Sequence, residues 1–202
     1  MTDDDHYKTI GSPAEGLFRD KGSRFIAFAF HVENEDEIRE HLAALRKKYH
    51  DATHHCYAWR LGVRGELSRA NDDGEPSGSA GRPILGQLLS YGLTYVLVVV
   101  VRYFGGTLLG VPGLINAYRS AAVDAIENSG IIVLADEVYL EAIFPYTAMD
   151  GVMKVVKNRR LRVAEQQLDN LCRIVLAVHR GEQTTVADIL CKIDGVRLSV
   201  PD

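Results

Sequence analysis

The sequence feature that most constrains the fold is an apolar run that leads into glycines. Residues 96–101 read Val-Leu-Val-Val-Val-Val, and their length and β-branched content predict a strand buried on both faces. Gly105 and Gly106 follow closely, and glycine allows backbone angles and close approaches that other residues do not. A helix is predicted from Pro112, which suits a first helical turn, to the residue before Gly130. Strand, glycine loop and helix start together place backbone amides where an anion can bind.

Composition narrows the functional classes. The chain has 202 residues, 25% of them charged, and a net charge of -4. This charge argues against nucleic-acid binding driven by the whole protein and leaves room for a local basic face. The three cysteines are far apart and no apolar secretory segment opens the sequence, so we expect a reducing, cytoplasmic location. The longest apolar run is shorter than the roughly 20 residues that cross a bilayer, so we expect no membrane role.

Residues 1–135 predict one domain that mixes helices and strands. Residues 1–13 are polar and predict an irregular start, while Asn34 is placed to cap a helix with Glu37 as its reciprocal partner. Turn-forming residues predict a long loop at 71–83. The predicted strands are 16–19, 23–31, 53–63, 96–101 and 131–134, and the predicted helices are 35–49, 83–89 and 112–129.

Residues 136–202 have a pattern of their own. The predicted strands are 137–144, 161–168, 171–179 and 196–200, and the predicted helices are 147–158 and 184–193. The order is therefore βαββαβ, which is that of the ferredoxin-like plan, with two helices on one face of a four-stranded sheet. The sequence as a whole predicts an α+β protein of two domains.

Three spaced motifs resemble one known family. They are Asp-Ala-Thr-His-His-Cys-Tyr-Ala at 51–58, Asp-Asp-Gly-Glu-Pro-Ser-Gly-Ser-Ala-Gly-Arg-Pro-Ile-Leu at 72–85 and Val-Arg-Tyr-Phe-Gly-Gly at 101–106. Together they resemble the IMPACT/YigZ family, over essentially the whole chain, as in its bacterial two-domain members.

The resemblance implies both a fold and a role. The first domain of the family is similar to the second domain of small-subunit ribosomal protein five, and the pair of domains is similar to domains IV and V of elongation factor G. This implies contact with RNA or the ribosome. Eukaryotic relatives regulate translation through an additional N-terminal partner-binding domain, which we do not expect in this chain, so that particular regulation is not transferred.

The sequence departs from the family pattern at four positions. Ser79 stands where Thr is common, Leu108 where Lys is common, Pro112 where Gly is common and Asn116 where Arg is common. Two positive charges are therefore missing, one from the glycine loop and one from the helix that follows it. Because charge-assisted hydrogen bonds to phosphate are about twice as strong as neutral ones, anion binding at this loop must depend on the remaining arginines and on backbone amides.

The glycine loop is the leading candidate site, for nucleic acid or another anion. The alternative is that the loop is only a tight, close-packed connection. Val111 and Pro112 stand where a nucleotide-binding loop carries Lys and Ser or Thr, so nucleotide hydrolysis is disfavoured. The candidate residues are Arg82, Arg102, Tyr103, Gly105, Gly106, Gly110 and Arg119.

A second candidate is the acidic loop with Asp72, Asp73 and Glu75. Clustered carboxylates can bind a hard cation or act as acid and base, but acidic residues are also common in turns. His54 and Cys56 share one strand face and offer only two soft ligands, so a packed pair is favoured over zinc. A nucleophile at Ser77 or Ser79, paired with His54 or His55, is disfavoured because the sequence has no nucleophile-elbow motif. We expect no metal and no cofactor.

A third candidate is a basic cluster in the second domain, either a phosphate contact or solvated charge at a helix end. Its members are Lys154, Lys157, Arg159, Arg160 and Arg162. The leading hypothesis is a non-enzymatic protein that binds RNA or a ribosome-associated partner in the regulation of translation. One alternative is a phosphate- or metal-dependent enzyme of unknown reaction that uses the 72–81 and 105–113 loops. The other is a protein-interaction module with a protein partner and no nucleic acid.

Overall fold

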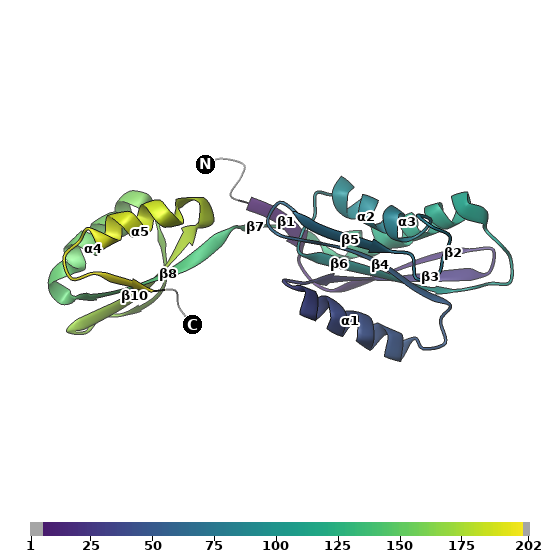
Figure 1. The fold of residues 1–202 in the computed structure, drawn as a ribbon, viewed down its shortest axis with the longest axis horizontal. Coiled ribbons are helices and arrows are strands. Elements are labelled where there is room, and N and C mark those ends of the chain that lie inside the picture. Colours follow the sequence, from purple (N-terminus) through teal and green to yellow (C-terminus); the bar gives the residue numbers. More distant parts are fainter. Residues whose placement is uncertain (1–5, 200–202) are drawn as a thin grey trace. The chain divides into compact units, whose positions relative to one another are not determined.

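The computed structural model of the chain describes residues 6–199 as two compact units, each mixing helices and strands (Figure 1). One unit comprises residues 7–134, and the other comprises residues 135–199 together with His6. A two-domain α+β organisation is therefore confirmed.

The first unit is built on a five-stranded sheet in the order β2-β3-β6-β4-β5. Its strands are β2 (Ala14–Asp20), β3 (Ser23–His31), β4 (His54–Leu61), β5 (Leu67–Asn71) and β6 (Val96–Tyr103), and all neighbours are antiparallel. The apolar run at 96–101 forms most of the central strand and is fully buried. The predicted two-faced strand is thus confirmed, and both faces of the sheet are covered.

Three helices supply these two covers (Figure 1). Helix α1 (Glu35–Lys48) lies on one face, and α2 (Gly81–Ser90) and α3 (Gly110–Ser129) lie on the other. The Asn34 side chain accepts the Glu37 amide at 3.0 Å, while the Glu37 carboxylate accepts from the Glu33 amide and the Asn34 side chain. These bonds satisfy amides that the first turn of a helix leaves without a partner.

Two strands of the first unit were not predicted. β1 (His6–Ile10) lies in the segment predicted to be irregular, and it pairs with β7 (Ile131–Ala135). The prediction is wrong for this part because Thr9 and Ile10 are buried, and the carbonyl of Lys8 accepts the amide of Thr94 at 2.9 Å. β5, at the sheet edge, was also missed, because its side chains are mostly exposed and show no apolar alternation.

The second unit has a four-stranded antiparallel sheet in the order β11-β8-β10-β9. Its elements are β8 (Glu137–Pro145), a short 3-10 turn (Tyr146–Ala148), α4 (Met149–Arg159), β9 (Arg162–Gln167), β10 (Leu171–His179), a second 3-10 turn (Arg180–Glu182), α5 (Gln183–Cys191) and β11 (Arg197–Ser199). Alternate residues of β8 and β10 pack against the buried faces of both helices. Of the strand predicted at 196–200, Val200 lies outside the described residues.

Within residues 6–199, no helix is both long enough and apolar enough to span a membrane.

Candidate functional site

The loop between β5 and α2 is held in shape by the side chain of Asp72. Its carboxylate accepts the amides of Gly78 at 2.8 Å, Ala80 at 3.1 Å and Gly81 at 2.7 Å. Burial opposes the charge of Asp72, but the amide bonds, led by that of Gly78, keep its pKa below the ordinary value. The start of α2 is therefore capped from within the chain, and the amides of Ala80 and Gly81 are already used.

Asp73 fastens the same loop to β4. Its carboxylate accepts the amide of His55 at 2.7 Å and a hydrogen bond from Arg46 at 3.3 Å, while its carbonyl oxygen lies 2.8 Å from Nδ1 of His54. The backbone turns left-handed here, with φ of 43° at Asp73 and 88° at Gly74. Asp72 and Asp73 thus hold the loop in shape through hydrogen bonds. No metal-ligand cluster occurs among residues 6–199.

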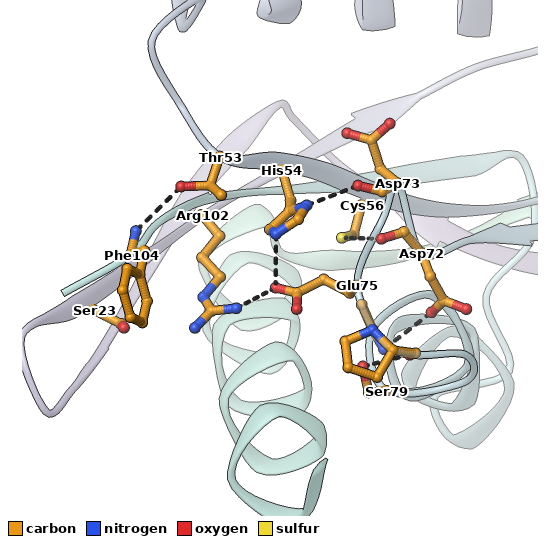
Figure 2. A network of polar contacts seen from close by, with 12 residues as sticks. Ser23, Thr53, His54, Cys56, Asp72, Asp73, Glu75, Ser79, Arg102 and Phe104 are labelled. Carbon is orange, nitrogen blue, oxygen red and sulfur yellow. Dashed lines mark hydrogen bonds and ion pairs between the residues drawn. The ribbon is translucent and has the colours of Figure 1, made fainter. Parts of the chain in front are cut away.

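Glu75 points inward, unlike its acidic neighbours in the loop (Figure 2). Its Oε1 accepts hydrogen bonds from Nη1 of Arg102 at 2.5 Å and from the hydroxyl of Tyr118 at 2.7 Å, and it lies 3.8 Å from Nε2 of His54. The side chains of Glu75 and Arg102 are only 3% and 7% exposed. The sheet register brings His54 and Arg102 together, because His54 of β4 lies directly opposite Arg102 of β6.

Cys56 belongs to the same buried network. Its thiol donates to the carbonyl of Asp72 at 3.0 Å and lies 3.3 Å from the hydroxyl of Tyr118. Burial raises the pKa of Cys56 well above its ordinary value, and burial likewise raises that of Tyr118. His55 lies on the opposite face, and burial lowers its pKa. Metal binding requires the thiolate, and the raised pKa of Cys56 keeps its thiol protonated at neutral pH.

A cavity of about 400 Å³ opens beside this network. Its floor is polar and carries Arg102 and Glu75, whereas its walls are mainly apolar and come from the glycine loop and the start of α3. Leu108, at the rim, is 82% exposed. The lining residues are Thr53, His54, Glu75, Pro76, Arg102, Phe104, Leu108, Leu109, Gly110, Val111 and Leu114.

A separate basic groove of about 490 Å³ lies at the turn between β2 and β3. Arg19, Lys21 and Arg24 are exposed there, and within the described chain none of them has a carboxylate partner. The guanidinium of Arg24 lies 4.6 Å from the centre of the Tyr103 ring, which orients it. The remaining lining residues are Asp20, Gly22 and Ser23. Among the lining residues, three cations against one carboxylate make this groove locally positive. A second carboxylate, that of Asp51, lies nearby, where it accepts a hydrogen bond from the hydroxyl of Tyr103 at 2.7 Å and attracts Arg24.

Gly105 joins the glycine loop to the same turn. Its amide donates to the hydroxyl of Ser23 at 3.1 Å, and a Cβ on Gly105 would lie 1.9 Å from the backbone carbon of Gly22. At this residue, the interpretation as a close-packed connection therefore holds. Gly106 and Gly110 are exposed and have φ of 87° and 72°, in the left-handed region that favours glycine.

The predicted arginines differ in their exposure. Arg102 is buried against Glu75, whereas Arg82 on α2 and Arg119 on α3 are exposed. The side chain of Arg82 lies over Gly78.

The predicted basic cluster of the second unit lies on α4 and the start of β9, with every member exposed. Arg159 lies 3.9 Å from Glu182, and Arg162 is paired with Glu137. Lys154, Lys157 and Arg160 have no acidic partner among residues 6–199.

Sequence reasoning missed Arg19, Lys21 and Arg24. The three charges were visible in the sequence, but their register was not. The strands predicted at 16–19 and 23–31 pair Arg19 with Ser23, whereas the two-residue turn of the structure places Arg19 directly opposite Arg24. Directly opposed residues of paired strands lie on one face of the sheet. Two opposed arginines beside a lysine in the turn indicate a basic surface.

Comparison with known proteins shows what the chain is similar to. The family model described as Impact N-terminal domain matches residues 21–126. A Thermus thermophilus protein, "IMPACT family member in pol 5'region", is 38% identical over 159 residues, which cover 79% of this chain and 86% of that protein. "IMPACT family member YigZ" of Escherichia coli is 40% identical over 110 residues, which cover 54% of each chain. "IMPACT family member YvyE" of Bacillus subtilis is 38% identical over 62% of this chain, and the chain spans 58% of that relative.

Solved structures add information on the fold. A crystal structure described as that of a hypothetical protein matches with a TM-score of 0.69 at 24% identity and covers 98% of each chain. This likeness concerns the fold alone. The structure of the two-domain translational regulator Yih1 is 31% identical over 58% of this chain and 46% of its own, but its TM-score is 0.35. A TM-score this low does not support any conclusion about the fold of this chain.

Proposed function

The chain belongs to the IMPACT family, and we propose that it acts in the regulation of translation by binding RNA, on the ribosome or free. The family resemblance supports the link with translation. The charge at the end of the β2–β3 hairpin supports the link with RNA. No enzymatic step is part of the proposal.

The basic groove is the observation that carries this proposal. Arg19, Lys21 and Arg24 gather there without carboxylate partners among residues 6–199, although the chain as a whole has a net charge of -4. Exposed arginines without partners are suited to phosphate, because guanidinium groups make charge-assisted hydrogen bonds with it. The Tyr103 ring holds Arg24 in place, so less side-chain freedom is lost when a phosphate binds.

Because Arg102 is buried, we place the proposed phosphate contact at the β2–β3 turn and not at the glycine loop. Arg102 was predicted to bind the anion, but its charge is compensated by Glu75 and its side chain is 7% exposed. Of the predicted residues, Tyr103 lines the groove and Gly105 packs against its turn. Arg82 and Arg119 remain free to contact RNA outside the groove, and the α4 cluster is a second candidate surface.

The sheets support a finer description of the fold, which we also propose. In the second unit, β8, α4, β9, β10, α5 and β11 follow one another, and the antiparallel sheet places β8 and β10 at its centre. This agrees with a ferredoxin-like domain, spanning 136–202. The resemblance of the first domain, 1–135, to the second domain of small-subunit ribosomal protein five, and of the pair to elongation factor G, fits a role near RNA.

Two variants that each remove three positive charges test the proposal. The groove variant carries Arg19→Gln, Lys21→Asn and Arg24→Gln, and the matched control carries Lys154→Gln, Lys157→Gln and Arg160→Asn. Each set replaces one residue that has positive φ, Lys21 or Arg160, with asparagine, which tolerates that conformation. Binding of labelled single-stranded RNA is measured by fluorescence anisotropy, and binding to ribosomes by co-sedimentation.

We expect the groove variant to lose at least about tenfold in RNA affinity, because three phosphate contacts disappear, while the control stays close to wild type. Equal binding by the groove variant and wild type would contradict the groove as the contact. A loss confined to the control variant would place the contact on α4. Absence of RNA and ribosome binding by wild type at low salt would contradict the function itself.

A further inference from the structure

The cavity beside Glu75 is separate from the basic groove that we propose to bind the RNA phosphates. We propose that it receives a single unstacked RNA base that carries an amino group, adenine or cytosine. This inference rests on the proposed RNA binding and identifies which part of the RNA enters the protein. Single-stranded RNA is commonly recognised in this way, with splayed bases on aromatic side chains and hydrogen bonds to their edges.

The size and walls of the cavity suit a planar ring. Its volume of about 400 Å³ lies within the usual range of roughly 300–1,000 Å³ for small-ligand pockets. Phe104 is 47% exposed, and the Arg102 guanidinium lies 5.6 Å from the centre of its ring, so the face available to a base is the one that Arg102 does not cover. Leu108, Val111 and Leu114 supply aliphatic surface. Stacking a base on an aromatic ring contributes roughly 1–3 kcal/mol. Leu108 makes this rim apolar at the position where the family commonly has lysine.

The floor of the cavity offers an unused acceptor. Oε1 of Glu75 has three neighbours, but Oε2 has no donor among the described residues and is not sealed from solvent. The Glu75 side chain is nevertheless 3% exposed, so this oxygen can face only the cavity that it lines. A buried acceptor without a partner costs free energy, and a ligand that donates a hydrogen bond removes this cost.

Donors lie beside that acceptor. Arg102 makes one hydrogen bond, through Nη1 to Glu75. Its Nε is buried without a partner, whereas the other hydrogens on Nη1 and Nη2 have no acceptor within residues 6–199 and can serve a ligand. His54 also lines the cavity. A matching ligand therefore has a donor next to an acceptor on one edge. Cytosine has this pattern in its 4-amino group and N3, and adenine has it in its 6-amino group and N1. A carboxylate that accepts a hydrogen bond from the amino group of cytosine is an established pairing.

The same floor argues against a phosphate in the cavity. The charge of Arg102 is compensated by Glu75, whose second oxygen would lie against the anion. Two anionic groups held close together in a buried site repel strongly. The phosphates are therefore left to the basic groove, and the cavity takes an uncharged group.

The groove and the cavity are neighbours along the chain. Tyr103 lines the groove and Phe104 lines the cavity. Arg102, which precedes Tyr103 in β6, also lines the cavity. Because side chains alternate along a strand, the two sites lie on opposite faces at the same end of β6. Gly22 and Gly105 are in backbone contact there and are exposed without side chains. An RNA strand can pass over this end with its phosphates in the groove and one base in the cavity.

Matched RNAs and variants test the base pocket. Binding of oligo(C) is compared with oligo(U), and binding of oligo(A) with oligo(I), since each pair replaces an amino group with a keto oxygen. The protein is wild type, Phe104→Ala, Glu75→Gln, or the control Tyr146→Ala, which removes an exposed aromatic from the other unit. Phe104→Ala changes a half-exposed side chain, so a folded protein is available even if Glu75→Gln is unstable.

We expect wild type and Tyr146→Ala to prefer the amino RNA in each pair by about tenfold, and Phe104→Ala to bind both members of a pair more weakly. Glu75→Gln must keep its oxygen toward the hydroxyl of Tyr118 and Arg102, which places its NH₂ group toward the cavity. The amino preference should then disappear or reverse. RNA binding by wild type with equal affinity within each pair would overturn the base pocket and leave the proposed function standing. No RNA binding at all would overturn both.

Discussion

Arg102 and Glu75 form an ion pair beneath the 72–80 loop, with Nη1 of Arg102 2.5 Å from Oε1 of Glu75. The side chain of Arg102 is 7% exposed and that of Glu75 is 3% exposed. This pair joins the central strand to the loop that precedes α2. Charges buried to this degree are tolerated only when each is compensated.

Removal of one partner should therefore destabilise the protein strongly. We expect Glu75→Ala to lower the free energy of unfolding by about 3–5 kcal/mol, because the charge of Arg102 is left buried and unpaired. Urea denaturation measures the change. The comparison is Arg46→Ala, which removes the partly exposed pair with Asp73 and should cost at most about 1 kcal/mol. A smaller loss for Glu75→Ala than for Arg46→Ala would refute a structural role for the buried pair.

Gly105 is expected to tolerate no side chain. A Cβ would meet the backbone of Gly22 and Ser23 at 1.9–2.1 Å, so Gly105→Ala should force the β2–β3 turn away and cost about 1–3 kcal/mol or more. Gly86 in α2 provides the control, because a Cβ there meets nothing within 4 Å. Gly86→Ala should be neutral or stabilising by up to about 1 kcal/mol. Thermal unfolding of both variants decides, and equal melting temperatures would count against the close contact.

The cysteines should differ in reactivity. Cys191 is exposed, whereas Cys56 and Cys172 are buried, and burial raises the pKa of Cys56. A disulfide reagent at about pH 8 should react rapidly with one thiol in the native protein, because reaction requires an accessible thiolate. Cys191→Ser should abolish this fast phase, whereas Cys56→Ala should leave it unchanged. Rapid reaction of Cys56 would mean that the core beneath the loop opens readily.

Stability should fall at alkaline pH. Burial raises the pKa of Cys56 above 9.0 and that of Tyr118 above 10.0, so the folded protein retains protons that the unfolded chain releases. The contribution of Cys56 is complete below pH 9.0 and is lost above it, by about 1.4 kcal/mol per pH unit. Urea denaturation of wild type and Cys56→Ala across this range measures the difference. The fall should be shallower for Cys56→Ala, and parallel curves would contradict the assignment.

Much of the fold is predictable because strong local patterns decide it. The run at 96–101 has no polar residue, so it must be buried on both faces, and Asn34 with Glu37 marks the start of α1 without ambiguity. The strand at 6–10 has no such pattern. It forms because its backbone pairs with residues more than eighty positions away, as in the bond from the Thr94 amide to the Lys8 carbonyl.

The site was less predictable than the fold, because its chemistry depends on which charges meet. The sequence places Arg102 beside the glycines and Glu75 in a distant loop, and nothing local shows that each compensates the other. The cavity likewise depends on packing between the start of α3 and the 72–80 loop. Arg19 and Arg24 meet because the β2–β3 turn has two residues, one fewer than predicted, which sets the register of the hairpin.

The salt dependence of RNA binding tests the central claim most directly. For single-stranded nucleic acid, the slope of log affinity against log salt changes by about 0.7 for each phosphate contact. Loss of Arg19, Lys21 and Arg24 together should therefore make the slope shallower by about 2, while the matched α4 variant keeps the wild-type slope. A groove variant with an unchanged slope would contradict the proposal that these three residues hold RNA phosphates.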